Sequence, residues 1–592
     1  MAGKTFVEKI FNANIGTIVF AHPDIVLSHD NTSSIINTFI KMGGTVIKDP
    51  SQLMITLDHN APPTTSKLAN DYQKIRDFVK DQQISRFHDV GHGICHQLMS
   101  LYARPGMIVV GSDSHTSTAG AFNSFAAGID RTETAGLWKQ GETWFRIPES
   151  IKITLNGRLK KGVYAKDLAL WIIGMIGSDG ADYKSIEFHG EGVTSLAIDE
   201  RMTLTNLASE MGAKNAVFPT DKVLMEFLNK QYEGIWADKD ATYCREIEID
   251  LSKLFPVVAA PHHVDNVKAI SEVSGIPIQQ SLIGTCTNGR LEDLRIAASI
   301  INGHVLPNGF QMHIIPASKE IFQQAMHEGL IDIFLNAGAN VLMPSCGPCL
   351  GTGQGIPADN INIISTANRN FKGRMGNPTA NIYLASPAVV AWSSIKGEIT
   401  DPREDKTVDV YPYKSEQSQT VDIKSGDNRL NDTIWNYADV DNLNTDQMFA
   451  GNLTYTINSS EGDKILPYLF KGFDDNFASR VKSGQIIIAG INFGCGSSRE
   501  HPSVGLAYAE IKAIICKSVN RIFYRSSVNQ GLPIIIQPLA VEAYKPGDET
   551  IIDFINGIVY IAGNKFHFAP LPDKLMEIFK AKGLVNFVRN LL

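Results

Sequence analysis

The chain has 592 residues, of which 43% are hydrophobic and 20% are charged, and its formal net charge is −8. This length exceeds what a single hydrophobic core can organise, so several domains are expected. Acidic and basic residues are mixed along the whole sequence, which argues against nucleic acid as the primary partner. No run approaches the roughly 18 apolar residues that span a bilayer, and the charged start lacks a signal-peptide pattern. We therefore expect a cytoplasmic protein with no membrane partner.

Residues 1–400 alternate short β-branched runs with helical patterns. The runs Gly106–Val110, Ile151–Leu155 and Gln311–Ile315 are examples. This alternation predicts layered α/β domains with largely parallel sheets. Small polar turns such as Gly111–Ser117 follow the ends of predicted strands, where open α/β sheets place their ligands.

The sequence becomes polar and aperiodic between Lys396 and Asp432. This texture predicts a linker over residues 401–430, although a long surface loop within one domain is the alternative. Beyond it, the predicted strands Gln485–Ala489 and Ala513–Ile515 flank a glycine-rich turn and a helix. Residues 431–592 are therefore predicted to form a second, smaller α/β unit.

Seven cysteines are too sparse and too irregular for a disulfide framework. Cys346 and Cys349 form a CxxC pair in a tight turn, and Cys286 follows an apolar strand. A closed zinc site would need a fourth ligand, whereas three cysteines can hold a four-iron cluster and leave one iron open. Taken alone, the three residues fit buried structural cysteines equally well.

Three polar segments combine histidine with a carboxylate or another reactive side chain, namely Leu57–Asn60, Gly93–Gln97 and Gly111–Thr116. A carboxylate beside an imidazole fixes its tautomer and raises its pKa, which makes a proton donor that is usable near neutrality. Each histidine by itself also fits an ordinary core or loop position.

Two segments suit anions. Asn368–Arg374 carries three cations, and the planar fork of arginine matches a carboxylate, although a solvated turn is the plainer interpretation. Asn492–His501 is a glycine-rich turn that leads into a helix and offers backbone amides, hydroxyls and an arginine. It fits a phosphate-binding turn, a tight αβ turn, or a serine activated by its surroundings.

Five of these segments, taken in chain order, closely resemble the signatures of the aconitase and isopropylmalate dehydratase superfamily: Gly111–Thr116, Gly284–Asn288, Cys346–Cys349, Asn368–Phe371 and Gly496–His501. The resemblance extends from His22–Asp24 to Gly531–Pro533. It implies a three-domain α/β/α body over residues 1–400 that carries an iron–sulfur cluster, followed by a C-terminal α/β swivel domain over residues 431–592. In many dehydratases of this family the two parts are separate subunits, whereas here they are fused.

The resemblance also implies roles for single residues. Cys286, Cys346 and Cys349 correspond to the ligands of a [4Fe-4S] cluster with one open iron. Ser497 matches the general base that removes a carbon-bound proton, and His59, paired with Asp58, matches the acid that protonates the leaving hydroxyl.

The implied polar network around the iron-bound water comprises His96, Asp113, His115 and Glu187. The implied substrate-binding residues are Ser114, Asn368, Arg369, Arg374, Ser498 and Arg499, and Arg499 would also hold Ser497 deprotonated. The reaction implied is anti elimination of water from a small hydroxy-polycarboxylate, followed by its re-addition at the neighbouring carbon.

The choice of substrate depends on a loop in the smaller unit. The segments Phe20–Asp30 and Gly162–Asp167 resemble the isopropylmalate dehydratase and homoaconitase branch. In the loop Asn444–Thr456, Tyr455 occupies the place where that branch carries an arginine. A third substrate carboxylate would need a cation there, because an unpaired buried charge costs several kcal/mol. The loop therefore favours a 3-isopropylmalate-like substrate.

Other substrates and functions stay open. Lys464 or Lys471 could supply the missing cation, which would favour citrate and isocitrate or homocitrate, although Ser34 stands where aconitases carry a substrate-contacting glutamine. A cluster-free RNA-binding regulator and a zinc-bound structural protein are alternatives of other classes. The expected assembly is a monomer or a small homo-oligomer.

Overall fold

The computed structural model describes residues 3–403, 408–413, 429–454, 456–569 and 572–590. The chain forms two compact units, each built from three stretches. The first unit comprises Met1–Asp30, Pro50–Gly128 and Glu142–Glu416, and the second comprises Asn31–Asp49, Ile129–Gly141 and Gln417–Leu592. Among the described residues, no helix has both the length and the apolar character needed to cross a membrane.

The first sheet of the first unit has five parallel strands in the order β4-β3-β2-β5-β6. Their bounds are β2 (Ile25–Ser28), β3 (Leu53–Thr56), β4 (Arg86–His88), β5 (Ile108–Gly111) and β6 (Phe125–Gly128). Because parallel strands end at the same edge of a sheet, the residues after β2, β3 and β5 are brought together there.

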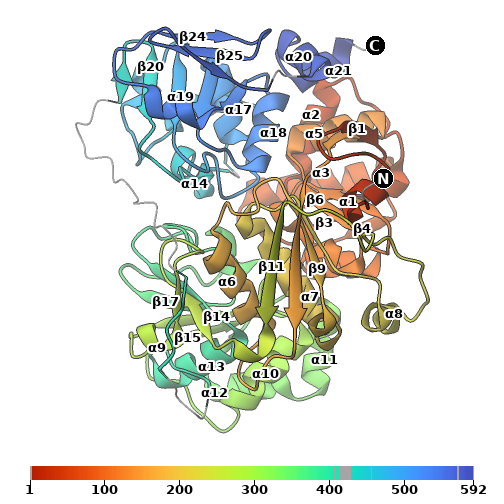
Figure 1. Cartoon of the computed structure of the whole chain (residues 1–592). Coiled ribbons are helices and arrows are strands. Elements are labelled where there is room, and N and C mark those ends of the chain that lie inside the picture. Colours follow the sequence, from red (N-terminus) through yellow and green to blue (C-terminus); the bar gives the residue numbers. More distant parts are fainter. Residues whose placement is uncertain (1–2, 404–407, 414–428, 455, 570–571, 591–592) are drawn as a thin grey trace. The chain divides into compact units, whose positions relative to one another are not determined.

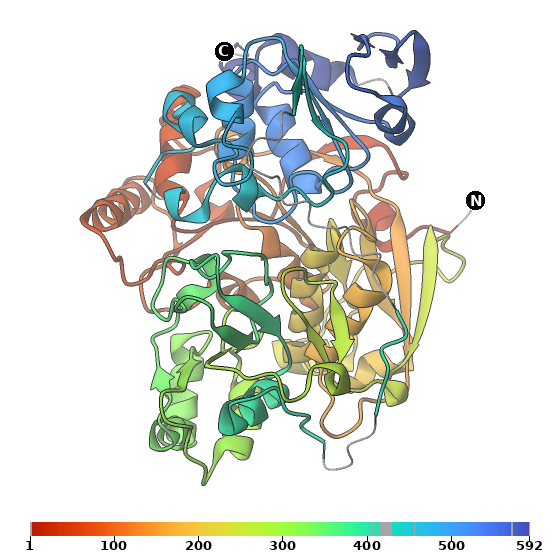
Figure 2. The ribbon, with the colours of Figure 1, turned by 90° about the vertical axis from the view of Figure 1, so that its left-hand side faces the viewer.

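The second sheet has four parallel strands in the order β10-β9-β8-β11. Their bounds are β8 (Ser150–Asn156), β9 (Ser185–His189), β10 (Asn215–Val217) and β11 (Arg245–Asp250). Apolar residues of helices α6 (Ala165–Ile176) and α7 (Ile198–Leu207) share one core with this sheet, and the helices and strands can be followed in Figures 1 and 2.

The third sheet has seven strands in the order β13-β12-β18-β17-β14-β15-β16. Their bounds are β12 (Val257–Ala259), β13 (Val267–Ala269), β14 (Gln280–Ile283), β15 (Gln311–Ile314), β16 (Asn340–Val341), β17 (Asn362–Ser365) and β18 (Asn381–Leu384). The strands from β18 to β16 are parallel, and β12 runs antiparallel to both of its neighbours. Neighbouring residues of β14 belong to two different cores, Leu282 to one and Ile283 to the other, which is the pattern of a sheet covered on both faces.

The second unit is built on a five-stranded sheet in the order β19-β20-β21-β22-β23. Its strands are β19 (Leu430–Asn431), β20 (Ile434–Tyr437), β21 (Ile486–Ala489), β22 (Ala513–Cys516) and β23 (Ile534–Ile536), and all pairs after the β19–β20 pair are parallel. Along β21, Ile487 and Ala489 belong to one core and Ile486 and Ile488 to another, so both faces of this central strand are buried.

The remaining elements complete the two units. The other helices of the first unit are α1 (Phe6–Ile10), α3 (Ser66–Asp81), α4 (Cys95–Leu98), α8 (Lys222–Leu228), α9 (Ile270–Val273), α10 (Leu291–Ile301), α11 (Lys319–His327), α12 (Leu330–Ala337) and α13 (Pro387–Lys396). Those of the second unit are α2 (Thr32–Lys41), α5 (Arg131–Gln140), α14 (Thr445–Met448), α15 (Gly462–Ile465), α16 (Phe477–Arg480), α17 (His501–Tyr508), α18 (Arg521–Asn529), α19 (Pro538–Ala543), α20 (Asp573–Lys580) and α21 (Leu584–Asn590). Two antiparallel sheets are added, β1 (Ile18–Ala21) with β7 (Thr143–Arg146), and β24 (Thr550–Asp553), β25 (Ile558–Ile561) and β26 (Asn564–His567).

Helices α2 and α5 group with the C-terminal part of the chain, although they lie within residues 1–400 of the sequence. The reason is a buried polar network between α5 and α18. Arg525 Nε donates to Glu133 Oε2 at 2.9 Å, and Asn529 Nδ2 donates to Asp130 Oδ2 at 2.6 Å. The side chains of Arg525 and Glu133 are 1% and 2% exposed. This buried ion pair therefore joins α5 to α18 within the second unit.

Replacing Arg525 by alanine is expected to lower the free energy of unfolding by about 3–5 kcal/mol, because it leaves the Glu133 carboxylate buried and uncompensated. Urea unfolding of the purified protein measures this loss. The matched control is Arg295→Ala, which breaks a surface pair with Glu328 and should cost less than about 1 kcal/mol. Equal losses in the two variants would contradict the structural role of the buried pair.

The predicted linker, residues 401–430, is only partly described, since residues 404–407 and 414–428 lie outside the described residues. In its first part, Arg403 forms ion pairs at 2.6 Å with both Asp401 and Asp409. Tyr411 is buried, meets Trp171 edge-to-face with ring centroids 4.8 Å apart and donates its hydroxyl to the Trp171 carbonyl at 2.7 Å. The described stretch up to residue 413 therefore packs as part of the first unit, and the linker boundaries stay a prediction.

Candidate active site

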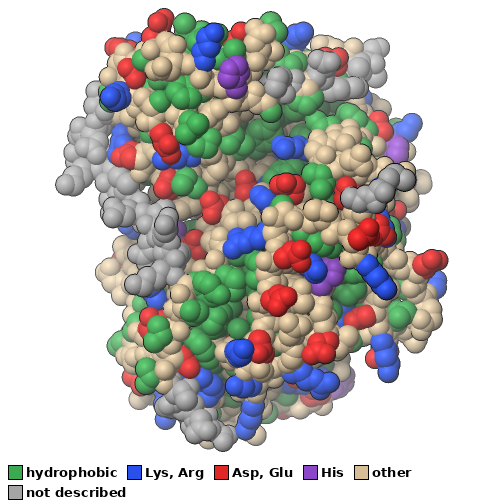
Figure 3. Space-filling view, viewed as in Figure 1, with side chains coloured by type: hydrophobic (Ala, Val, Ile, Leu, Met, Phe, Trp, Pro, Cys, Tyr) green, Lys and Arg blue, Asp and Glu red, His purple; other side chains and the backbone are tan. Residues whose placement is uncertain are grey.

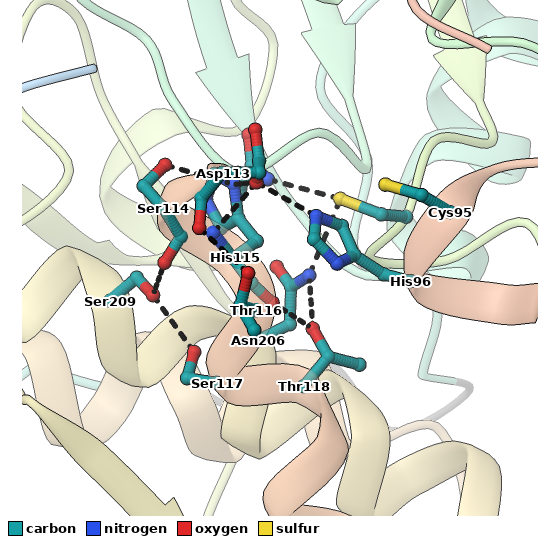
Figure 4. A network of polar contacts seen from close by, with 12 residues as sticks. Cys95, His96, Asp113, Ser114, His115, Thr116, Ser117, Thr118, Asn206 and Ser209 are labelled. Carbon is teal, nitrogen blue, oxygen red and sulfur yellow. Dashed lines mark hydrogen bonds and ion pairs between the residues drawn. The ribbon is translucent and has the colours of Figure 1, made fainter. Parts of the chain in front are cut away.

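Asp113 lies at the centre of a buried group of imidazoles (Figure 4). Its Oδ1 is 2.7 Å from His96 Nε2 and accepts the backbone N–H of His115 at 2.8 Å, and its Oδ2 is 3.4 Å from His59 Nε2. Asp113 follows β5 and caps the 3-10 helix Ser114–Phe122. Burial would raise the pKa of Asp113, but the surrounding histidines hold it well below its ordinary value. The carboxylate therefore stays ionised and orients the rings.

His59 is paired with Asp58 as the sequence predicted. The distance from His59 Nδ1 to Asp58 Oδ1 is 2.7 Å, and Asp58 Oδ2 accepts the backbone N–H of Cys95 at 2.7 Å. Burial lowers the pKa of His59, but Cys346, Asp58 and Asp113 outweigh that effect and raise it well above the ordinary value. This environment favours a protonated imidazole, which suits a general acid.

Arg369 follows β17 and is ordered by a second carboxylate. Its Nε lies 2.9 Å from Glu210 Oε1, and its Nη2 donates to Ser114 Oγ at 3.0 Å. Glu210 Oε1 is also 2.8 Å from His115 Nε2. Burial opposes ionisation of Glu210, yet Arg369 and His115 lower its pKa to about 2. Glu210 therefore links the predicted anion-binding arginine to the imidazole group.

The described contacts of Glu187, which the sequence analysis placed in this network, lie elsewhere. Its carboxylate accepts the backbone N–H of Phe6 at 3.0 Å and the hydroxyl of Tyr243 at 3.0 Å, and it lies 3.5 Å from His189 Nε2. Glu187 is part of strand β9, whereas Glu210, in the 3-10 helix Ala208–Met211 that follows α7, contacts His115 and Arg369.

Two of the three predicted ligand thiols, those of Cys286 and Cys349, contact Asn368. Its Nδ2 donates to Cys286 Sγ at 3.4 Å, and its Oδ1 accepts from Cys349 Sγ at 3.7 Å. Asn206 Nδ2 donates to Cys286 Sγ at 3.3 Å. Cys286 and Cys346 belong to one small buried cluster. Because β14 and β17 are parallel neighbours, the turns after them deliver Cys286 and Asn368 to the same edge of the third sheet.

The chemistry of this set fits an iron–sulfur cluster. Burial raises the pKa of the Cys286 thiol to about 12, so only a bound cation would keep the sulfur as a thiolate in this environment. The N–H donors of Asn206 and Asn368, together with Arg374 Nη2 at 3.8 Å from Cys349 Sγ, point at the sulfurs. Such donors stabilise metal-bound thiolates and tune the cluster.

Lys166 supports the turn that carries Asn368, a role that no motif around this lysine indicates. Its ammonium group is completely buried and donates to the carbonyls of Thr366 at 3.0 Å and Ala367 at 2.7 Å. Burial lowers the pKa of Lys166 to about 7. The lysine thus holds the backbone immediately before Asn368 and Arg369.

In the second unit, Ser497 is paired with a threonine. Its backbone N–H donates to Thr445 Oγ1 at 3.0 Å, and the two hydroxyl oxygens are 3.4 Å apart. Arg499 donates from Nη1 to Asp446 Oδ1 at 2.6 Å and to the Phe449 carbonyl at 3.1 Å. The described contacts of Arg499 therefore order the loop after β20, and its action on Ser497 stays a prediction.

The turn that presents Ser497 requires glycine. Gly494 and Gly496 have φ angles of 73° and 101°, which side chains with a Cβ rarely adopt. A Cβ on Gly494 would also lie 2.2 Å from Phe523. Ser497 itself is half-buried, and α17 begins only at His501, so the serine belongs to the turn and not to the helix.

The proposed specificity residue Tyr455 lies outside the described residues. The two lysines that could replace its missing charge have other partners. Lys464 Nζ lies 2.6 Å from Glu461 Oε1, and Lys471 Nζ lies 5.4 Å from the centre of the Tyr468 ring. The described contacts of these two lysines are therefore with Glu461 and Tyr468, and they do not orient either ammonium group for binding a third carboxylate.

Ser498 and Ser34 were also named from the sequence. Ser498 is half-buried next to Ser497. Ser34, in α2, donates its hydroxyl to the Asn31 carbonyl at 2.8 Å, a bond local to its own helical turn.

The fold and the site together define a layered α/β enzyme in which parallel strands deliver buried carboxylate–imidazole pairs beside a three-thiol centre.

Comparisons with known proteins identify the family. Residues 5–397 match the aconitase family (aconitate hydratase), and residues 409–539 match the aconitase C-terminal domain. The 3-isopropylmalate dehydratase large subunit 1 of Methanopyrus kandleri is 42% identical over 414 residues, which cover 68% of this chain and 99% of that protein. The 3-isopropylmalate dehydratase large subunit 2 of Archaeoglobus fulgidus is 45% identical over 414 residues, which also cover 68% of this chain and 99% of that protein. The probable methanogen homoaconitase large subunit of Methanosarcina mazei is 45% identical over 393 residues, covering 65% of this chain and 100% of that protein.

The chain therefore belongs to the aconitase family, and it is a hydro-lyase. The predicted family and α/β fold class are confirmed. Proteins of this family generally carry a [4Fe-4S] cluster and act on hydroxy-polycarboxylates.

Proposed function

We propose that the chain is an iron–sulfur dehydratase and isomerase that moves the hydroxyl of a 3-isopropylmalate-like acid to the neighbouring carbon. The observation that carries this proposal is a centre of three buried thiols: Cys286 and Cys349 contact Asn368, which comes directly before Arg369, and Cys346 shares a small buried cluster with Cys286. Such a centre places metal ligands and a carboxylate-binding group on one turn.

Cys286, Cys346 and Cys349 would hold the [4Fe-4S] cluster, with one iron left open. When bound, the cluster supplies a Lewis acid that polarises the substrate hydroxyl and carboxylate. Arg369 would bind a substrate carboxylate, because its guanidinium is already ordered by Glu210 and Ser114. The other proposed substrate-binding residues are Ser114, Asn368, Arg374, Ser498 and Arg499.

His59 would be the acid of the elimination. As the carbon–oxygen bond breaks, the proton on His59 passes to the departing hydroxide and forms water, while Asp58 holds the ring. His96, Asp113 and His115 would orient that water through the contacts around the Asp113 carboxylate.

Ser497 would be the base. Its oxygen takes the proton from the carbon next to the hydroxyl-bearing carbon, and the electron pair of that C–H bond becomes the double bond as hydroxide leaves. Re-addition returns the proton and the hydroxyl to exchanged carbons, so the overall reaction is an isomerisation with no net gain or loss of water.

The substrate preference has two supports. Two of the relatives described above are named as 3-isopropylmalate dehydratase large subunits, and the lysines nearest the specificity loop in sequence are engaged with Glu461 and Tyr468. A homoaconitase activity is the second candidate, favoured by the Methanosarcina mazei relative. Citrate and isocitrate remain an alternative to be tested beside both.

The relatives are named as large subunits and leave about a third of this chain unmatched. We propose that the C-terminal unit supplies, within the same chain, the part that a separate small subunit supplies for them. The fused protein would then act as a monomer or a small homo-oligomer. A cytoplasmic location is part of the proposal, since a reducing compartment suits the free cysteines.

The test is a paired absorbance assay. The protein is purified without oxygen, its iron and sulfide are restored, and hydration of isopropylmaleate, cis-aconitate and cis-homoaconitate is followed side by side. We expect the highest kcat/KM with isopropylmaleate. A preference for either tricarboxylate would show that a cation binds a third carboxylate, and the substrate proposal would be wrong.

A cluster-free, RNA-binding role is the competing class. On the face shown in Figure 3, Lys and Arg side chains are interspersed with Asp and Glu among the coloured residues, which is unlike the basic surface expected for RNA binding. Colourless protein that binds RNA and has no hydratase activity would favour this role. Zinc in place of iron would favour a structural metalloprotein.

A further inference from the structure

A fourth imidazole faces Asp113, and the proposed mechanism gives it no role. His29 Nε2 lies 4.0 Å from Asp113 Oδ2, and the His29 ring stacks on the His59 ring with centroids 3.8 Å apart and an angle of 17° between the planes. His29 is 4% exposed. A buried, nearly parallel contact of this kind restricts rotation of both rings.

The position of His29 follows from the first sheet. His29 comes directly after β2, which lies between β3 and β5, and the turns after β3 and β5 carry His59 and Asp113. The middle strand therefore delivers His29 between the two. This placement is a consequence of parallel strands that end at one edge.

The next residue along the chain fixes the backbone of the same turn. The Asp30 carboxylate accepts the N–H groups of Asp58 at 2.9 Å, His59 at 3.1 Å and Asn60 at 2.6 Å. The Tyr72 hydroxyl also donates to Asp30, at 2.5 Å. A carboxylate that accepts three consecutive amides leaves the backbone of His59 little freedom, so the remaining freedom is rotation of its side chain.

Three groups restrict that rotation. Asp58 contacts Nδ1 of His59, Asp113 faces Nε2, and His29 covers one ring face. The distance of 4.0 Å between His29 and Asp113 is too long for a hydrogen bond. The direct contact between His29 and His59 is the stacking of the two ring faces.

We infer that His29 is a positioning residue for His59, keeping its imidazole in the plane that joins Asp58 to Asp113. The inference depends on the proposed role of His59 as the acid. The positioning role requires an aromatic ring at position 29 for a high kcat. Binding of the substrate and of the cluster does not require that ring.

Three substitutions test the requirement for a ring. His29→Ala and His29→Gln remove it, and we expect kcat to fall about 10- to 100-fold with KM within about threefold, as for a slight misplacement of a reacting group. His29→Phe keeps a ring face and should restore most of the lost kcat. Iron and acid-labile sulfide content should match the wild type in all three. The matched control, His189→Ala, alters a histidine in the Glu187 cluster and should leave kcat unchanged.

Several results would overturn the inference. They are a wild-type kcat in His29→Ala, a rise in KM with kcat preserved, or a loss in folded, iron-loaded His29→Phe as large as in His29→Ala. If His29→Phe loses its iron, the comparison of His29→Ala with His29→Gln and the wild type still decides, because a polar side chain should give no rescue.

A double-mutant cycle separates this inference from the proposed function. Asp58→Asn and His29→Ala should each lower kcat, and together they should lower it by less than the product of the two effects, since both act on the orientation of His59. Strictly multiplicative effects would refute the positioning role. His59→Gln with wild-type activity would instead refute the proposed acid, whatever the cycle shows.

Discussion

Replacing Cys346 by serine is expected to abolish hydratase activity and to leave the purified protein without iron–sulfur absorption. Cys346 is buried, its backbone N–H donates to the Asp58 carbonyl at 3.2 Å, and it belongs to the same buried cluster as Cys286. A serine oxygen is a poor ligand for a cluster that prefers thiolates. Loss of one preorganised electrostatic group costs about 10²–10³ in rate, so losing the whole Lewis-acid centre should cost at least about 10³-fold.

Iron and acid-labile sulfide analysis, visible absorption and the isopropylmaleate assay measure this result together. The matched control is Cys244→Ser, because Cys244 is exposed and its thiol donates to the Ser150 carbonyl. It should keep full iron content and activity. An active Cys346→Ser protein with unchanged iron would contradict the assignment of the three-cysteine centre.

The polar turns at the carboxyl ends of the parallel strands were predictable from the sequence. The turns that carry Asp58, Asp113 and Cys286 each follow a short apolar run, and parallel strands bring such turns to one edge whatever the intervening length. Local composition is enough for this inference, because the strand and the turn that follows it are contiguous. The pairing of Asp58 with His59 is likewise a contact between sequence neighbours.

The exchange of Glu187 for Glu210 shows where local reasoning ends. Both carboxylates are buried, but only Glu210 contacts His115 and Arg369. Those contacts join three separate parts of the first unit, so no short motif contains them. One signal was present: Asn206 and Glu210 are four residues apart, a spacing that puts two side chains on the same face of a helix.

The grouping of α2 and α5 with the C-terminal sheet has the same cause. Nothing in the composition of residues 31–49 or 129–141 distinguishes them from the α/β body around them. Their association depends on partners almost 400 positions away, such as Glu133 with Arg525. A buried ion pair of this kind becomes visible only when both partners are placed in three dimensions.

Replacing Ser497 by alanine is expected to lower kcat by about 10²–10⁴-fold, the range for loss of a positioned acid or base, while the cluster is retained. Ser497 belongs to the C-terminal unit and Cys346 to the first unit, so the substitution leaves all three thiols in place. The hydroxyl lies 3.4 Å from Thr445 Oγ1, and the turn that carries it is fixed by the bond from its backbone N–H to the same oxygen. That bond does not involve the Ser497 side chain, and the turn should therefore survive in the alanine variant.

The measurement is the kcat for isopropylmaleate hydration, accompanied by iron content and thermal unfolding. Ser479→Ala, an exposed serine of the same unit, is the control and should match the wild type in all three. A Ser497→Ala enzyme that keeps its iron and its kcat would remove the serine as the base. Loss of iron in that variant would mean that the two units depend on each other for the cluster, and the lower rate would then report cluster loss instead of proton transfer. Cys346→Ser should lose both iron and rate, whereas Ser497→Ala should lose rate alone. Because each substitution changes one unit, comparing the two variants separates the contribution of the metal centre from that of the base.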